Sequence, residues 1–125
     1  MAGTAANGTI DVTRGGGEFG RGFYTQNSPS NALRWSRGRF RDGCLLELNL
    51  DDVAFQALDQ LVLDVNAAWK LTQSIRKKKT ERTYLSGHDV MIGPIQGGPD
   101  RTQQKFESRN AQNLVNGPQT QRTVI

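Results

Sequence analysis

The chain has 125 residues, of which 35% are hydrophobic and 22% are charged, and its formal net charge at pH 7 is +4. This length predicts a single domain, residues 1–125, that is long enough for one modest core. The single cysteine, Cys44, excludes an internal disulfide and favours a reducing compartment, the cytoplasm of the producing cell or of a cell that receives the protein. We find no apolar stretch that predicts a signal peptide or a membrane span.

The first third of the chain predicts two short strands and one short helix. Ile10 and Val12 alternate with polar neighbours, which predicts a strand over Thr9–Thr13. Aromatic and β-branched residues predict a second strand over Gly22–Thr25. Ser28 is a good N-cap residue and is followed by proline, so we expect a short helix to begin there and to end near Gly38.

The middle of the chain predicts a strand followed by a long helix. Over Cys44–Leu50, one face would carry Cys44, Leu46, Leu48 and Leu50, and the other would carry Leu45, Glu47 and Asn49, as in a half-buried strand. Asp51 or Asp52 then caps a helix over Val53–Lys79, whose apolar residues recur at spacings of three and four. That single apolar stripe favours packing of the helix inside the domain.

The last third predicts shorter elements. We expect strands at Asp89–Ile92 and Gln103–Phe106, joined by a loop at Gln96–Asp100, and then a helical turn at Ala111–Val115. Residues 116–125 are expected to form a loosely held tail. Because strands and helices do not alternate regularly, the predicted fold class is α+β rather than a doubly wound parallel sheet.

Several familiar sites are excluded or disfavoured. The glycines of 15–20 satisfy G-x-G-x-x-G, but a strand rather than a helix is expected after them, so a dinucleotide-binding loop of the Rossmann type is disfavoured. One histidine, His88, and one cysteine cannot assemble a zinc site from the usual ligands. Cys44 is interpreted as a core residue, and no serine-hydrolase motif is present.

The excess of basic over acidic residues favours an anionic partner, such as nucleic acid, a phosphate-bearing small molecule or an acidic protein. Two runs of cations stand out, Arg34–Arg41 and Arg76–Lys79. The first interleaves four arginines with Trp35 and Phe40, which suits contacts to phosphates and bases. The second also fits a solvated helix end that complements the helix dipole.

Three segments stand out in order: Phe19–Thr25 with Ala32 and Trp35, His88–Ile95, and Gln104–Ser108 with Ala111 and Leu114. Together they resemble a bacterial ADP-ribosyltransferase-like family whose members are often found in toxins. Phe19–Thr25 reads F-G-R-G-F-Y-T and is followed by Ala32 and Trp35, similar to the family motif F-G-[KR]-G-F-Y-x-T…A-x-x-W. His88–Ile95 reads H-D-V-M-I-G-P-I and resembles the family's Y-D-[IV]-[IV]-I-G-P-[IV] strand. Gln104–Ser108, with Ala111 and Leu114 after it, resembles the closing Q-[IV]-x-F-x-[ST]…A-L element.

This resemblance implies a split β-sheet, with one long and one or two short helices, that holds NAD+ in a central cleft. Tyr24 would stack on the nicotinamide, and Phe23 would face the other side of the strand. Thr25 and Asn27 would support the cleft by hydrogen bonds. Arg21 or Arg34 would bind the pyrophosphate, and Gly22 is also implied as a residue of the NAD+ cleft. Arg14 is the candidate for a contact with the adenosine-side ribose or phosphate.

The late strand would carry the catalytic side chain. Related transferases use a glutamate there, whereas this chain offers Gln104 as the best match and Glu107 as the second candidate. A glutamine can hold a ribose hydroxyl but cannot act as a base, which favours NAD+ hydrolysis or transfer to an already good nucleophile. The family also opens with an [HR]-G dipeptide, for which Arg14-Gly15 is the candidate, closer to the next motif than the family has it.

The resemblance therefore predicts an NAD+-cleaving toxin or effector domain, either an ADP-ribosyltransferase or an NAD+ glycohydrolase. A cognate antitoxin or immunity protein is implied as a partner, because unchecked depletion of NAD+ harms the producer. The alternative is a non-catalytic module on the same fold that binds protein or nucleic acid through Arg34–Arg41 and Arg76–Lys79.

Overall fold

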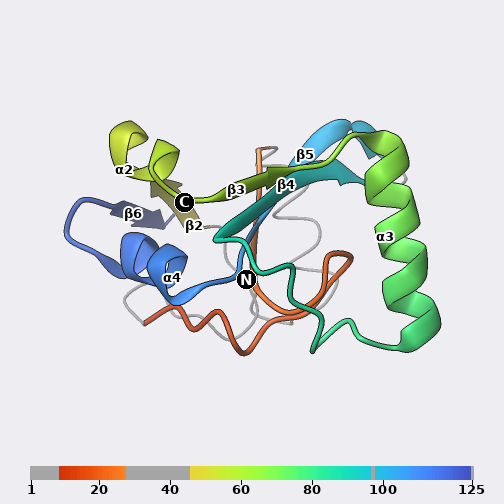
Figure 1. Ribbon diagram of the computed structural model, residues 1–125. Coiled ribbons are helices and arrows are strands. Elements are labelled where there is room, and N and C mark those ends of the chain that lie inside the picture. Colours follow the sequence, from red (N-terminus) through yellow and green to blue (C-terminus); the bar gives the residue numbers. More distant parts are fainter. Residues whose placement is uncertain (1–8, 28–45, 97, 125) are drawn as a thin grey trace.

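The computed structural model describes residues 9–27, 46–96 and 98–124, which form two β-sheets and three helices (Figure 1). The larger sheet has four strands in the order β1-β5-β4-β3, and the smaller sheet pairs β2 with β6. The predicted α+β class is confirmed, while the likeness to the ADP-ribosyltransferase fold stays a prediction. No helix in these ranges is long and apolar enough to cross a membrane.

The four-stranded sheet contains three of the predicted strands. β1 (Phe23–Gln26) and β4 (Val90–Ile95) both pair antiparallel with β5 (Gly98–Phe106). β3 (Gln60–Val62) adds to the far edge, parallel to β4. The loop predicted at Gln96–Asp100 is wrong beyond residue 97, because β5 already begins at 98 and pairs back onto the end of β4.

The smaller sheet corrects the prediction of a loose tail at 116–125. β2 (Leu46–Asn49) confirms the predicted strand within the described residues, and β6 (Gln121–Val124) pairs with it along its whole length. The tail is therefore held by the hydrogen bonds between β2 and β6. The polar sequence of β6 does not predict this pairing. Cys44 and the predicted helix after Ser28 lie outside the described residues.

The long helix predicted over Val53–Lys79 is wrong, because three elements share that stretch. α2 (Asp52–Gln56) is a short helix, β3 follows it, and α3 (Val65–Lys78) is the longest helix. Asp51 caps α2, as predicted, by accepting a hydrogen bond from the Ala54 amide at 2.9 Å. The expected stripe does not form one buried face.

Carboxylates and β-pairing explain the break in this helix. Asp64 accepts a hydrogen bond from the Ala67 amide at 2.8 Å and is therefore the N-cap of a separate helix, α3. Between the helices, the backbone of Gln60–Val62 pairs with β4. Helical spacing of apolar residues alone does not distinguish this strand from a turn of helix.

The strand predicted at Thr9–Thr13 is also wrong, although its apolar residues are buried as expected. The backbone amide of Ile10 donates to Asn116 Oδ1 at 2.8 Å, and that of Val12 donates to Gln112 Oε1 at 3.0 Å. Asn116 Nδ2 returns a hydrogen bond to the Ile10 carbonyl. The segment thus pairs with side chains of α4 (Arg109–Asn116), the helix that extends the predicted turn, rather than with another strand.

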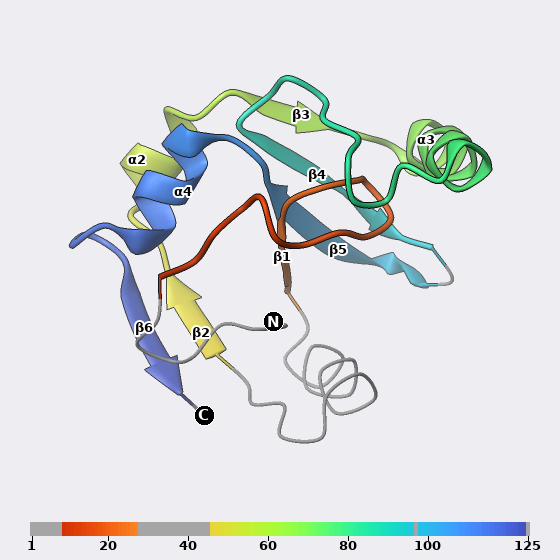
Figure 2. The same cartoon turned by 90° about the horizontal axis from the view of Figure 1, so that it is seen from below.

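Among the described residues, the core consists of two clusters on opposite faces of the four-stranded sheet. The first face packs against α4, α2 and the smaller sheet through Ile10, Val12, Phe23, Val90, Phe106, Ala111 and Val115, with Leu48 and Phe55 at its margin. The second face packs toward α3 through Phe19, Ala68 and Met91, with Tyr24 and Leu71 at its margin. Figure 2 shows this arrangement, with α2, α4, β2 and β6 on one side and α3 on the other.

Candidate functional site

The pairing of β1 with β5 decides which predicted site residues meet. Thr25 stands opposite Gln104, and Tyr24 stands opposite Lys105. Side chains alternate between the two faces of a strand. Thr25 and Gln104 therefore share the first face with Phe23, while Tyr24 and Lys105 share the second. The expected placement of Phe23 and Tyr24 on opposite faces is confirmed.

Three predicted residues form one hydrogen-bonded group, which we call the amide–hydroxyl cluster: Thr25, Asn27 and Gln104. Thr25 Oγ1 donates to Gln104 Oε1 at 2.6 Å, and Gln104 Nε2 donates to Asn27 Oδ1 at 2.8 Å. The partners are 79 and 77 residues apart in sequence, so only the fold unites them. Thr25 and Gln104 are partly exposed and Asn27 is exposed, which leaves the cluster open to a ligand.

The chemistry of the cluster is that of uncharged hydrogen-bonding groups. Amides and a hydroxyl can orient a ligand rich in hydroxyls, since each offers both a donor and an acceptor. None of the three side chains can take up a proton as a general base near neutral pH. The described residues also contain no group of three or more acidic, histidine or cysteine side chains that could hold a metal ion.

Tyr24 does not lie beside Gln104. Its hydroxyl accepts a hydrogen bond from the Phe19 amide at 3.0 Å and donates one to the Gly20 carbonyl at 2.5 Å. The ring is so close to Gly17 that a Cβ there would lie 2.9 Å from the tyrosine Cζ. Burial raises the pKa of Tyr24 far above its usual value, so the hydroxyl stays protonated. One bound nicotinamide cannot contact both Tyr24 and Gln104.

Glu107, the second catalytic candidate, is buried and fully engaged. Its carboxylate lies 2.5 Å from the ammonium of Lys105 and accepts hydrogen bonds from the Ser86 amide and hydroxyl and from the Gly87 amide. Lys105, which is 0% exposed, also donates to the Phe19 carbonyl at 2.8 Å. This arrangement fixes the loop at 86–87 to the sheet, and it sets Glu107 apart from Gln104, as their odd spacing predicts.

The pKa values of this pair follow from burial and from mutual attraction. Burial by itself would raise the pKa of Glu107, but the hydrogen bond and charge of Lys105, with the Ser86 and Gly87 amides, hold it below the usual value. Burial lowers the pKa of Lys105, and Glu107 opposes that shift. Each of the two groups thus favours the charged form of the other, against the effect of burial.

The other residues predicted to contact NAD+ have different surroundings. Arg14 is exposed and forms an ion pair with Asp11, the Nε–Oδ2 distance being 3.5 Å. Gly22 lies against Lys105, since an added Cβ would be 2.5 Å from Lys105 Cγ. Arg34 and the rest of Arg34–Arg41 lie outside the described residues. The glycine-rich loop leads into β1 and not into a helix, which confirms the argument against a Rossmann loop.

One polar group was missed by sequence reasoning. Glu18 Oε1 accepts hydrogen bonds from the Gln96 amide at 3.1 Å and from Gln103 Nε2 at 2.9 Å, on the second face of the sheet. The alternation of Gln103 with Gln104 along β5 is the signal that separates the two amides. The predicted strand at Gln103–Phe106 already carries this signal, but no sequence pattern links Gln103 to Glu18.

Comparisons with models of known protein families, with curated proteins and with solved structures find no match to this chain. The function of the chain therefore has to be argued from its residues and their geometry. The amide–hydroxyl cluster is the accessible feature that unites residues predicted to share a site.

Proposed function

We propose that this protein cleaves the nicotinamide–ribose bond of NAD+, as an ADP-ribosyltransferase or an NAD+ glycohydrolase. The observation that supports this is the amide–hydroxyl cluster. Thr25, Asn27 and Gln104 were assigned to the NAD+ cleft by resemblance, from segments nearly 80 residues apart, and they hydrogen-bond to one another on one sheet face. The net charge of +4 also suits a substrate that carries a pyrophosphate.

In the proposed reaction, the bond between the ribose C1′ and the nicotinamide nitrogen breaks, and nicotinamide leaves with the electron pair. Positive charge builds on the ribose, and the oxygen of water, or an acceptor nucleophile, then bonds to C1′ and releases a proton to solvent. Gln104 fixes a ribose hydroxyl, and Thr25 and Asn27 hold the glutamine amide in one orientation. Catalysis of this kind rests on positioning rather than on a general base.

Tyr24 has a structural role in this proposal rather than a stacking one. Its hydroxyl ties the loop of Phe19 and Gly20 beneath β1, and β1 carries Thr25. The nicotinamide then contacts groups on the first face, where the cluster lies. A cognate antitoxin or immunity protein remains the partner expected for such an activity.

The test is NAD+ turnover by the purified protein, with free nicotinamide followed by chromatography. Gln104→Ala should reduce release at least a hundredfold, because the ribose loses its anchoring group. Gln73→Ala is the matched control, since it removes the same amide from an exposed position on α3. Unchanged release in Gln104→Ala would contradict the assignment of Gln104. If the protein neither releases nicotinamide nor binds NAD+ in calorimetry, the non-catalytic module is the better hypothesis.

A further inference from the structure

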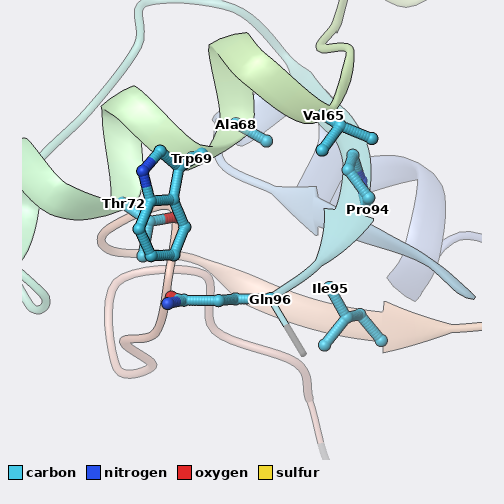
Figure 3. Close-up of a pocket in the computed structure, with 7 residues that line it drawn as sticks. All are labelled: Val65, Ala68, Trp69, Thr72, Pro94, Ile95 and Gln96. Carbon is cyan, nitrogen blue, oxygen red and sulfur yellow. The ribbon is translucent and has the colours of Figure 1, made fainter. Parts of the chain in front are cut away.

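A hollow lies between α3 and the C-terminal end of β4, away from the amide–hydroxyl cluster. Its volume is about 170 Å³. Figure 3 shows Trp69 on one side, Val65 and Pro94 on the other, and Ile95 and Gln96 along the floor. A cavity of about 150 Å³ lined by aliphatic side chains holds one benzene ring. The hollow therefore has the size of a single apolar side chain.

Apolar side chains on and beside the rim of this hollow are exposed to solvent. Trp69 is 50% exposed, Val65 is 55% exposed, and Val62 on the adjoining strand β3 is 68% exposed. A half-exposed tryptophan beside a concave apolar site is typical of the residues that dominate binding at protein interfaces. The hollow and its rim together form an unpartnered apolar site.

The same helix is strongly basic. Its exposed cations follow the hollow along α3 and its C-cap: Lys70, Arg76, Lys77, Lys78 and Lys79. None of these five forms an ion pair within the described part of the chain, and α3 itself contains no acidic residue. At 1.5 Å per residue, Arg76 lies about 10 Å along the helix axis from Trp69. An extended peptide crosses that distance in about three residues.

We propose that this surface, the hollow with the cations of α3, docks an acidic polypeptide segment. The segment inserts one apolar side chain against Trp69 and places carboxylates, three or more residues further on, beside Arg76–Lys79. The charge of the partner follows from the unpaired cations, and its apolar anchor follows from the lining of the hollow. This inference does not depend on NAD+ cleavage.

A polypeptide fits the hollow better than a nucleic acid does. A nucleobase carries several donors and acceptors on its edges, which need partners when they are buried. Among the lining residues only Thr72 and Gln96 are polar, and the Thr72 hydroxyl already contacts the Glu18 carbonyl at 3.5 Å. The Gln96 side-chain oxygen is enclosed and has no hydrogen-bond partner among the described residues, so the lining offers one unpaired acceptor, fewer groups than the several donors and acceptors of a nucleobase need. An aliphatic or phenyl side chain has no such requirement.

The experiment uses a fluorescein-labelled synthetic peptide of 12 residues, in which one phenylalanine is followed by four glutamates among glycine and serine. Binding to the whole protein is measured by fluorescence anisotropy at low and high salt. We expect the dissociation constant to rise at least tenfold when the phenylalanine is replaced by alanine, or in Trp69→Ala. Lys77→Glu should weaken binding about threefold or more, and so should added salt.

Two further variants keep the test decisive. Val65→Asp places a negative charge on the exposed rim and should repel the peptide without disturbing the core. Val53→Ala, at a valine that is 79% exposed on α2, is the matched control and should bind like the wild type. The proposal is overturned if the alanine peptide or Trp69→Ala binds equally well. It is also overturned if a single-stranded oligonucleotide binds more tightly than the peptide and displaces it.

Discussion

Neighbouring polar residues of β1 and β5 have different surroundings on the two faces of the four-stranded sheet. On the second face, Lys105 is buried and Tyr24 is partly buried, and each of their polar groups has a partner within the fold. On the first face, Thr25 and Gln104 form an open cluster with Asn27. A shift of one residue along either strand thus moves a side chain from the fixed interior of the protein to its candidate site.

The cost of burial explains this difference. A charged group removed from water needs a full set of partners, and Lys105 and Glu107 have them. A partly exposed amide such as Gln104 can exchange a protein partner for water or for a ligand at little cost. We therefore expect substitutions on the second face to reduce stability and those on the first face to reduce activity.

The largest expected effect comes from breaking the buried ion pair. Glu107→Gln leaves the Lys105 ammonium buried without an opposite charge and turns an amide toward the Ser86 and Gly87 donors. We expect the free energy of unfolding to fall by about 3 kcal/mol, measured by urea denaturation. Removal of the second charge in Glu107→Gln/Lys105→Met should recover part of this loss. Strictly additive effects of the two substitutions would contradict a coupled pair.

A smaller effect is expected from acid. The pKa of Glu107 in the folded protein lies below its usual value of 4.5, so the unfolded chain takes up the proton first as the pH falls. The stability contributed by this carboxylate is therefore complete above about pH 4.5 and is lost as the pH falls through the lower, folded-state pKa. Unfolding curves between pH 3 and pH 7 measure this loss, which should be reduced in Glu107→Gln.

Asp11 provides the control for that measurement. Its pKa is also lowered, by hydrogen bonds from the Thr13 hydroxyl and backbone amide, and it lies in an exposed turn far along the chain from Glu107. Asp11→Asn should leave most of the acid dependence in place. If Asp11→Asn removed it and Glu107→Gln did not, the ion pair would not be its source.

The sequence predicts those parts of the fold in which local pattern and tertiary pairing agree. Aromatic and β-branched residues predict β1, alternation predicts the described part of β2, and the last four residues of β5 are also predicted as a strand. Alternation within β1 places Phe23 and Tyr24 on opposite faces, as observed. The sequence pattern did not separate α2, β3 and α3, because Phe55, Val62 and Trp69 fit a helical stripe that the pairing of β3 with β4 overrides. Polar β6 was missed because its order comes from β2 and not from its own residues.

The candidate site, like the fold, could be predicted only in part from the sequence. Resemblance singled out Thr25, Asn27 and Gln104, which the fold unites. It also grouped Tyr24 with them, although alternation along β1 puts Tyr24 and Thr25 on opposite faces. The register of β1 against β5 then shows that Gln104 shares the face of Thr25. The partners of Glu107 come from a loop 20 and 21 residues earlier, and no sequence pattern marks that contact.

The finest test of the difference between the faces uses the adjacent residues Tyr24 and Thr25. Tyr24→Phe removes the hydroxyl that joins the Phe19 amide to the Gly20 carbonyl, so the free energy of unfolding should fall by about 1 kcal/mol. Because the phenyl ring remains and faces away from Gln104, kcat/KM for NAD+ should stay within about twofold of wild type. Urea denaturation and nicotinamide release give the two readouts.

Thr25→Val makes the opposite prediction with a side chain of nearly the same shape. It removes the donor that orients the Gln104 amide, so kcat/KM should fall about tenfold, while stability should change by less than about 0.5 kcal/mol because the site is partly exposed. If Tyr24→Phe instead impaired turnover and Thr25→Val did not, the substrate would have to lie on the second face. The substrate would then have to bind near Tyr24, although the tyrosine hydroxyl already has two hydrogen-bond partners in the fold.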